Sequence, residues 1–189
     1  PRAIANLRFF AAAATQFTSE SHHGQAGLNY TLRQPLGVVA CISPWNLPLY
    51  LFTWKIAPAL AAGNCVVAKP SEITPVTAWM LGELAREIGF PPGVLNIVHG
   101  FGDEPGEALV SHADVRAISF TGSSHTGNRI VRTSALNDFP VDLGRTTPFP
   151  LFTASHFVTV PTAPGFSILP NPPRHCARRQ RHGRPAPLT

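Results

Sequence analysis

Four short apolar runs alternate with four helix-like segments between residues 37 and 133, and this alternation limits the folds open to the chain. The first run is continuous and β-branched, as in a strand buried on both faces, and the second is read as a buried strand as well. The four runs cover residues 37–42, 65–68, 94–98 and 115–120. The helix-like segments cover residues 50–62, 74–88, 102–111 and 124–133. Strands that alternate with helices join in parallel through right-handed crossovers, so the sequence predicts an α/β fold with a partial Rossmann-like parallel sheet and flanking helices.

The segments before this core are less regular. Apolar residues at helical spacing predict an amphipathic helix over residues 2–18, followed by a loop over 19–29 and a short strand at 30–33. Within the core, we expect Thr74 to be the N-cap of the helix at 74–88, with Pro75 at its first position.

From about residue 134 the composition changes. Residues 140–189 hold ten of the 20 prolines, six arginines and one aspartate, so no helix or central strand of useful length is expected there. Residues 1–139 contain nine basic and nine acidic residues, so the formal charge of +5 comes from the end of the chain. We therefore divide the chain into an α/β portion, 1–133, and an irregular Pro/Arg-rich tail, 134–189, which we expect to be disordered. The abrupt change indicates a readthrough or frameshifted end.

Several classes of function are not supported by the sequence. No apolar run is long enough to span a membrane, and no secretory signal opens the chain. The three cysteines are sparse and lack metal-ligand spacing, so we predict a cytoplasmic protein without a metal site. The arginines of the tail lack interleaved aromatic residues, so neither nucleic acid nor membrane is predicted as a partner.

Three polar blocks follow the strands at 115–120, 65–68 and 37–42, where ligand-binding loops of such sheets lie. The first is Phe120-Thr121-Gly122-Ser123, placed before a helix. The free N–H groups and dipole of a helix start can bind a phosphate, and the Ser123 hydroxyl can add a donor. The alternative is an ordinary N-capped helix whose glycine serves the turn.

The second block is Lys69-Pro70-Ser71-Glu72. A Lys and a Glu at this spacing can both reach ribose hydroxyls, and the carboxylate would repel a 2′-phosphate, which favours NAD over NADP. The alternative is a surface ion pair that contributes little. The third block is Pro44-Trp45-Asn46-Leu47-Pro48, whose Asn amide can stabilise a developing alkoxide or, alternatively, cap the next helix.

Together the blocks resemble the aldehyde dehydrogenase superfamily from about Tyr30 to Ile130, including Trp54–Asn64, Gly89–Val94 and Gly100–Gly102. The sequence Leu-Pro-Leu-Tyr at 47–50 is similar to that of the branch of the family that oxidises 2-aminomuconic and related semialdehydes. The resemblance implies NAD-dependent oxidation of an aldehyde to a carboxylate, with Asn46 as the oxyanion-hole amide. Residues 1–133 would then be part of the NAD-binding domain. Cofactor-binding roles are implied for Ile42, Ser43, Trp45, Lys69, Ser71, Glu72, Gly106, Phe120, Thr121, Gly122 and Ser123.

The chain departs from the family after this region. Val141-Asp142-Leu143-Gly144-Arg145 stands where the family has Glu-Leu-Gly-Gly-Lys, and we interpret it as a chance match or a decayed remnant. The reaction needs a thiolate that attacks the aldehyde before hydride passes to the nicotinamide. Cys41 and Cys65 lie inside predicted strands, and the surroundings of Cys176 share nothing with the nucleophile loop of the family.

Three hypotheses follow for the chain. It is a family member truncated before its catalytic Cys and inactive alone, a non-catalytic NAD-binding or oligomer-associating module, or an inert fragment. The partners that the resemblance implies are an aldehyde, NAD, and a homo-oligomer or full-length relatives.

Overall fold

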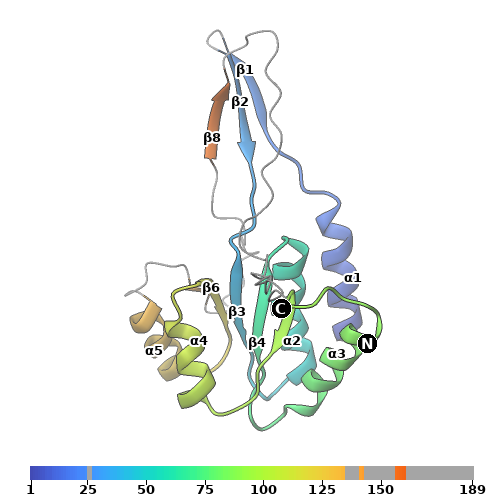
Figure 1. The fold of residues 1–189 in the computed structure, drawn as a ribbon, viewed down its shortest axis with the longest axis vertical. Coiled ribbons are helices and arrows are strands. Elements are labelled where there is room, and N and C mark those ends of the chain that lie inside the picture. Colours follow the sequence, from blue (N-terminus) through green and yellow to red (C-terminus); the bar gives the residue numbers. More distant parts are fainter. Residues whose placement is uncertain (25–26, 135–140, 143–155, 161–189) are drawn as a thin grey trace, which may run out of the picture.

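The computed structural model describes residues 1–24, 27–134, 141–142 and 156–160, the last two segments by their backbone alone (Figure 1). The helices are α1 (Arg2–Ala14), α2 (Pro48–Ala61), α3 (Val76–Glu87), the π-helix η1 (Gly102–Gly106), α4 (Glu107–Ser111) and α5 (Ser124–Ser134). The strands are β1 (Ser21–Gly24), β2 (Gly27–Leu32), β3 (Val38–Ile42), β4 (Cys65–Lys69), β5 (Leu95–Ile97), β6 (Val115–Phe120), β7 (Val141–Asp142) and β8 (His156–Val160).

A parallel sheet of five strands forms the centre of the described chain. Its order is β5-β4-β3-β6-β7, and every neighbouring pair is parallel. The predicted α/β fold with a parallel sheet and flanking helices is confirmed. The chain starts at β3, adds β4 and β5 on one side, and then returns to the other side of β3 with β6. The order therefore reverses between β3 and β6, which is the switch point where sheets of this kind bind ligands.

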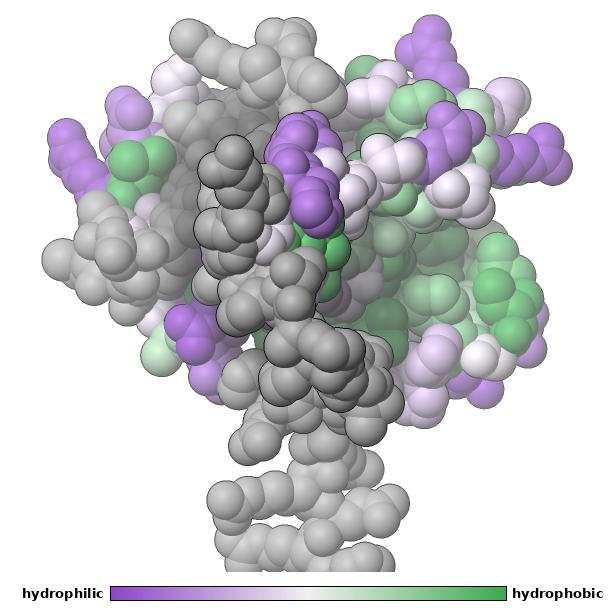
Figure 2. Space-filling view, turned by 90° about the horizontal axis from the view of Figure 1, so that it is seen from above, coloured by the Kyte–Doolittle hydropathy of each residue, from purple (hydrophilic) through white to green (hydrophobic). Residues whose placement is uncertain are grey.

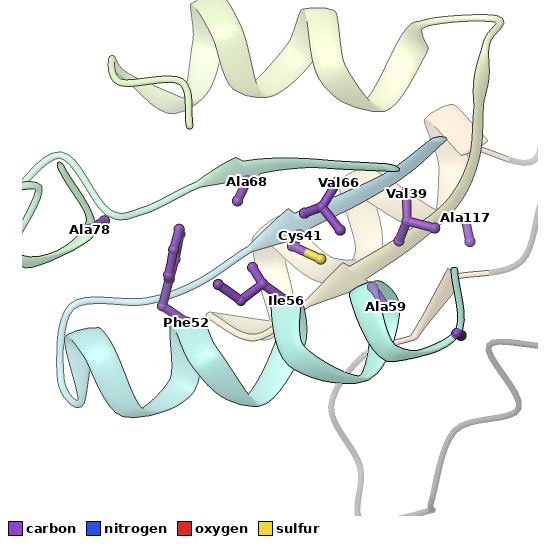
Figure 3. Close-up of a cluster of buried hydrophobic side chains, with 10 residues drawn as sticks. Val39, Cys41, Phe52, Ile56, Ala59, Val66, Ala68, Ala78 and Ala117 are labelled. Atoms are coloured by element: carbon purple, nitrogen blue, oxygen red, sulfur yellow. The ribbon is translucent and has the colours of Figure 1, made fainter. Parts of the chain in front are cut away.

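Helices cover both faces of this sheet, and each face has its own apolar cluster. Between the sheet and the α2/α3 layer lie ten buried residues, among them Val39, Cys41, Phe52 and Ile56 (Figure 3). On the other face Ile118 packs with residues of α4 and α5. Strands enclosed in this way must be apolar on both sides, which is why β3 and β4 are continuous apolar runs in the sequence.

The end of α2 is fixed by Gly63 and Asn64. Gly63 has φ +80°, a conformation that allows the helix to stop and the chain to turn into β4. The fully buried side chain of Asn64 then accepts hydrogen bonds from Leu36 N and Gly37 N (2.7 and 3.2 Å) and donates to Ala59 O (3.1 Å). One amide therefore joins the end of α2 to the start of β3.

Three local predictions were wrong. The expected loop over 19–29 is largely a hairpin, in which β1 pairs antiparallel with β2. Strand β1 has no apolar residue, so the sequence carries no period-two signal there, whereas Leu28, Tyr30 and Leu32 alternate along β2. Thr74 does not cap α3, because Pro75 is the N-cap and makes no side-chain capping bond. The expected helix over 102–111 begins as a π-helix, with Pro105 inside it.

The predicted tail lies mostly outside the described residues. Two strands are described within 134–189, and both lie at the edge of a sheet, so they are not the central strands that the prolines argued against. β7 continues the parallel sheet beside β6, and β8 pairs antiparallel with β2. The small sheet β1-β2-β8 extends away from the α/β body (Figure 1). Because the chain passes from β2 into β3, the amino ends of the parallel strands face this small sheet and their carboxyl ends face away from it.

Apolar side chains reach the surface beside charged ones (Figure 2). Several of them lie on or next to α3, and each is more than half exposed. They are Ile73, Val76, Trp79, Met80, Leu84 and Ile88. Within the described segments, the helices are too short or too polar to cross a membrane. Those segments also contain no group of three or more potential metal ligands.

Candidate functional site

The loops that follow β3, β4 and β6 meet at the carboxyl edge of the sheet. Ser43 N donates to Lys69 O (3.1 Å), which joins the first loop to the second. Thr121 N donates to Ile42 O (3.1 Å), which joins the third loop to the first. The three polar blocks of the sequence are thus brought together at the switch point, as predicted from their positions after the strands.

Lys69 and Glu72 form an ion pair of 3.7 Å in which the two partners differ in exposure. The Lys69 side chain is 5% exposed and the Glu72 side chain 41% exposed, so the alternative of a purely surface pair does not fit. The buried hydroxyl of Ser71 accepts a bond from Ile73 N (3.3 Å) and shapes the turn that carries Glu72. Gly106 lies against the Lys69 stem, because a Cβ on it would be 3.7 Å from Cδ and Cε of Lys69.

The Phe120–Ser123 loop is shaped by packing as well as by capping. Phe120 is buried in the core, so it supports the loop from below. Its ring lies so close to Gly122 that a Cβ there would come within 2.5 Å of it. The Ser123 hydroxyl accepts a bond from Thr126 N (3.1 Å), so the capping interpretation of Ser123 holds. The first turn of α5 nevertheless directs its remaining N–H groups toward the edge of the sheet.

Trp45 and Asn46 are exposed in the turn between β3 and α2. Leu47 is the N-cap of α2, and the cap has no side-chain hydrogen bond, so Asn46 does not cap this helix. Pro48 at the first helical position fixes where the helix begins. The Asn46 amide is therefore carried on a turn held by a strand end on one side and a helix start on the other.

Ser43 differs from its neighbours in its hydrogen bonding. It is 4% exposed, and its Oγ has no hydrogen-bond partner among the described residues. Most buried hydroxyls in proteins have a hydrogen-bond partner, so Ser43 is an exception among the described residues.

Sequence reasoning gave no role to Lys55. This lysine of α2 is 4% exposed, and its Nζ donates to Thr121 Oγ1 (2.7 Å), with Ser119 Oγ at 3.5 Å. It joins α2 to the loop after β6. The sequence signal that could have identified Lys55 is its place on the apolar face of the helix, among the buried residues Phe52, Ile56 and Ala59.

An open hollow of about 470 Å³ lies next to the Asn46 turn, and sequence reasoning missed this as well. It is lined by the start of α1 and by residues 47–50. Its walls are apolar except for Arg2, whose guanidinium lies 5.7 Å from the centre of the Tyr50 ring. The hollow is open, and its exposed lining is almost entirely apolar.

The family model described as "Aldehyde dehydrogenase family" matches residues 1–153. The chain belongs to the aldehyde dehydrogenase family. The match begins before Tyr30 and ends after Ile130, the range that the quoted motifs cover.

Curated aldehyde dehydrogenases similar to the chain come from animals and bacteria. The 2-aminomuconic semialdehyde dehydrogenase of Bos taurus is 55% identical over 158 residues, which are 80% of this chain and 32% of the relative. The 2-aminomuconic 6-semialdehyde dehydrogenase of a Pseudomonas species is 54% identical over 147 residues, which are 75% of this chain and 30% of the relative. The chain therefore spans about a third of the length of the curated relatives that it matches.

Solved aldehyde dehydrogenase structures share the fold. PnpE from Pseudomonas sp. WBC-3, solved in complex with nicotinamide adenine dinucleotide, aligns with TM-score 0.73 and 49% identity over 76% of this chain and 30% of that one. The NAD+ complex of the Bacillus cereus aldehyde dehydrogenase aligns with TM-score 0.72 and 42% identity over 74% of this chain and 28% of that one. NAD is thus the cofactor in solved structures of this family.

The family match includes residues 141–145, which the sequence analysis interpreted as either a chance match or a decayed remnant of the Glu-Leu-Gly-Gly-Lys segment. Residues 141–145 lie inside it, and Val141 and Asp142 add to the sheet as β7. Asp142 pairs in register with Ser119 of β6. Both observations favour the remnant of a family segment over chance.

Proposed function

We propose that residues 1–133 are an NAD-binding portion of an aldehyde dehydrogenase, and that the chain binds NAD at the carboxyl edge of its parallel sheet. The observation that carries this proposal is the meeting of three polar loops at the switch point, joined by the bonds from Ser43 N to Lys69 O and from Thr121 N to Ile42 O. Residues 134–189 are the Pro/Arg-rich part of the chain, and we assign no cofactor contact to them.

The residues present fit a dinucleotide. Lys69 and Glu72 supply a donor and an acceptor within one ion pair, as two ribose hydroxyls require. Ser123 and the first turn of α5 supply donors for the pyrophosphate. Ile42, Ser43 and Trp45 line the cleft between these two ends, and Gly106 leaves space beside Lys69 for the adenosine side. The exposed carboxylate of Glu72 disfavours a 2′-phosphate, so NAD is preferred over NADP.

The aldehyde end of the reaction lies at the Asn46 turn. When bound, NAD accepts a hydride from the substrate carbon. The Asn46 amide donates to the oxygen of the reacting aldehyde, and the adjoining hollow holds the rest of the substrate. The relatives named 2-aminomuconic semialdehyde dehydrogenase support a semialdehyde as the substrate class of the lineage.

We propose that the chain alone does not turn over aldehyde, because its described cysteines are poorly placed for attack. Cys41 lies within β3 in the core between the sheet and α2, and it is 1% exposed (Figure 3). Cys65 lies within β4 and is 7% exposed. A nucleophile must reach the substrate in a near-attack geometry, which a side chain packed inside a strand cannot do.

Calorimetric titration of the chain with NAD tests the proposal. We expect saturable binding that weakens about ten-fold or more in Lys69→Ala and in Glu72→Ala, since each change removes a charged hydrogen-bonding group. Glu83→Ala and Arg86→Ala are matched controls, because this pair has the same spacing on α3 but is exposed, with a 2.8 Å ion pair. The controls should bind NAD as the unchanged chain does.

Two results would contradict the proposal. Absence of NAD binding would remove the cofactor site. Steady-state formation of NADH from NAD and an aldehyde, abolished by a single Cys→Ser change, would show that the chain carries its own nucleophile.

A second candidate function is a non-catalytic module that associates with full-length relatives or with itself. The exposed apolar face of α3 favours it, because contiguous exposed apolar surface marks sites of protein association, and four large apolar residues of α3 with two beside it are more than half exposed. We place either form of the protein in the cytoplasm, with a small-molecule aldehyde and NAD as ligands and neither nucleic acid nor membrane as a partner.

A further inference from the structure

Lys55 is a buried cation to which the proposed function gives no role. The residue is 4% exposed, and its neighbours in α2 include the core residues Phe52 and Ile56. Burial removes an ammonium from water, which costs free energy unless polar groups replace the lost hydrogen bonds. The Lys55 Nζ lies 2.7 Å from Thr121 Oγ1 and 3.5 Å from Ser119 Oγ. The shorter bond leads from the core into a loop of the proposed cofactor site.

Thr121 is held by two elements at once. Its backbone N donates to Ile42 O at the end of β3 (3.1 Å), and its side chain is bonded to α2 through Lys55 (2.7 Å). The residue is only half-buried, so part of it remains open to a ligand at the carboxyl edge of the sheet. The bond from Lys55 therefore acts on a side chain that a cofactor can still reach.

The direction of this hydrogen bond determines what the Thr121 hydroxyl can do. An ammonium has three donors and no acceptor, so Thr121 Oγ1 accepts the bond from Lys55. A hydroxyl has one proton of its own, and that of Thr121 is then left for an acceptor elsewhere. Lys55 thus makes Thr121 a donor toward whatever lies on its open side.

The sheet register indicates which half of a dinucleotide lies near Thr121. Ile42 of β3 pairs with Lys69 of β4 on one side and with Phe120 of β6 on the other. Neighbouring strands are about 4.8 Å apart, so the backbones at Lys69 and Phe120 are separated by roughly 10 Å. Because the proposed function places the adenosine ribose beside Lys69, Thr121 lies nearer to the nicotinamide half, which carries acceptor oxygens on its phosphate, ribose and carboxamide.

We propose that Lys55 is a positioning residue of the cofactor site, whose ammonium fixes the Thr121 hydroxyl as a hydrogen-bond donor to the nicotinamide half of NAD. This inference rests on the proposed function, because it adds a residue that acts on the same site from the core. Lys55 itself does not contact the cofactor. Without it, the Thr121 hydroxyl can rotate and donate to water, so affinity for NAD falls while the fold remains.

The test compares Lys55→Met with the unchanged chain by thermal unfolding and by calorimetric titration with NAD and with AMP. Met is similar in length to Lys and suits apolar surroundings, so we expect an unfolding temperature at least as high as that of the unchanged chain. NAD binding should weaken about three- to ten-fold, since one hydrogen bond is lost. AMP binding should not change, because AMP lacks the nicotinamide half.

Ser119→Ala is the matched control for the titrations. It removes the longer of the two described Lys55 contacts, and Ser119 belongs to β6 rather than to the loop. This variant should bind NAD as the unchanged chain does. Ten-fold weaker binding in Ser119→Ala would mean that any loss around Lys55 disturbs the site, and it would overturn the assignment to Thr121.

A double-mutant cycle checks that Lys55 acts through the Thr121 hydroxyl. Thr121→Val keeps the shape of the side chain and removes the hydroxyl. The variant with both Lys55→Met and Thr121→Val should bind NAD no more weakly than Thr121→Val alone, because the group that Lys55 positions is already absent. Thr121→Ser keeps a hydroxyl and should restore most of the affinity. Losses that add in the double variant would overturn the inference.

The remaining outcomes separate this inference from the proposed function. Failure of the unchanged chain to bind NAD overturns the proposed function and this inference with it. Binding of NAD by the unchanged chain and equally tight binding by Lys55→Met overturns the inference alone. A lower unfolding temperature in Lys55→Met, with affinity lost equally for NAD and AMP, shows a purely structural lysine and also overturns it.

Discussion

Single side chains decide the shape of the proposed cofactor loop. Phe120 is a core residue, yet its ring determines what can stand two positions later, because a Cβ at Gly122 would lie 2.5 Å from the ring. Flexible side chains yield to such an approach, but a ring packed in the core cannot move without opening a void. The glycine of this loop therefore serves close packing as well as the turn.

We expect Gly122→Ala to lower the free energy of unfolding by about 1–3 kcal/mol, as overpacking of a core does. Gly102→Ala is the control, because a Cβ at Gly102 would meet nothing within 4 Å. Chemical denaturation of both variants checks the prediction. Equal stability of Gly122→Ala and the unchanged chain would mean that the ring shifts freely.

Only some residues of the candidate site could be predicted from the sequence. Lys69, Glu72 and Ser123 follow strands within polar blocks, so their place at the carboxyl edge of the sheet could be predicted from the sequence, while their cofactor roles stay a prediction. Lys55 stands within an apolar helix face, and only the fold shows that its ammonium reaches Thr121 from α2 (2.7 Å). The unpartnered state of the Ser43 hydroxyl is likewise a property of its surroundings, which spacing along the chain does not encode.

At the scale of elements, the junction between α2 and the sheet depends on a single buried amide. Asn64 accepts from two backbone N–H groups at the start of β3 and donates to α2. The bonded groups are 27 and 28 residues away in the sequence, so the contact holds elements together rather than a local turn.

We expect Asn64→Ala to destabilise the chain by about 2–3 kcal/mol, because it leaves backbone donors without a partner in a largely buried place. Asn96→Ala is the matched control. The Asn96 amide also bonds two backbone oxygens, those of Val66 and Gly93, but its surroundings are more exposed and water can replace it. Denaturation midpoints that fall equally in both variants would show that burial of Asn64 adds nothing.

The elements that the sequence predicted best are those with a continuous apolar signal. β3 and β4 lie within one residue of the predicted runs because burial on both faces requires apolar residues almost throughout, and β6 matches its run although it includes Arg116 and Ser119. β1 was missed because its residues, Ser21–Gly24, include no apolar side chain, and Ser21, His22 and His23 are exposed. Its pairing with β2 therefore leaves no alternation of apolar and polar residues in the sequence of β1. The π-helical start of the 102–111 segment depends on a local insertion that helical periodicity does not resolve.

At the scale of the whole molecule, the chain spans about a third of its curated relatives and exposes apolar surface on α3. Trp79 and Met80 are each more than half exposed there. We expect the double change Trp79→Ser with Met80→Gln to weaken self-association of the chain at high concentration, because it removes apolar area available for contact.

Sedimentation velocity over a range of concentrations checks this expectation. Glu87→Gln serves as the control, since it changes a polar residue of the same helix and leaves the apolar face intact. An unchanged distribution of species in the double variant would show that this face does not mediate association.

The strand order also has a consequence for how the chain emerges from a ribosome. β3, the middle strand of the sheet, is synthesised first among the five, and β4 and β5 can join it soon afterwards. The opposite edge of β3 has to wait for β6, so a nascent chain carries an open strand edge during that interval. The same edge borders the switch point, so the proposed cofactor site is completed only after β6 has been synthesised.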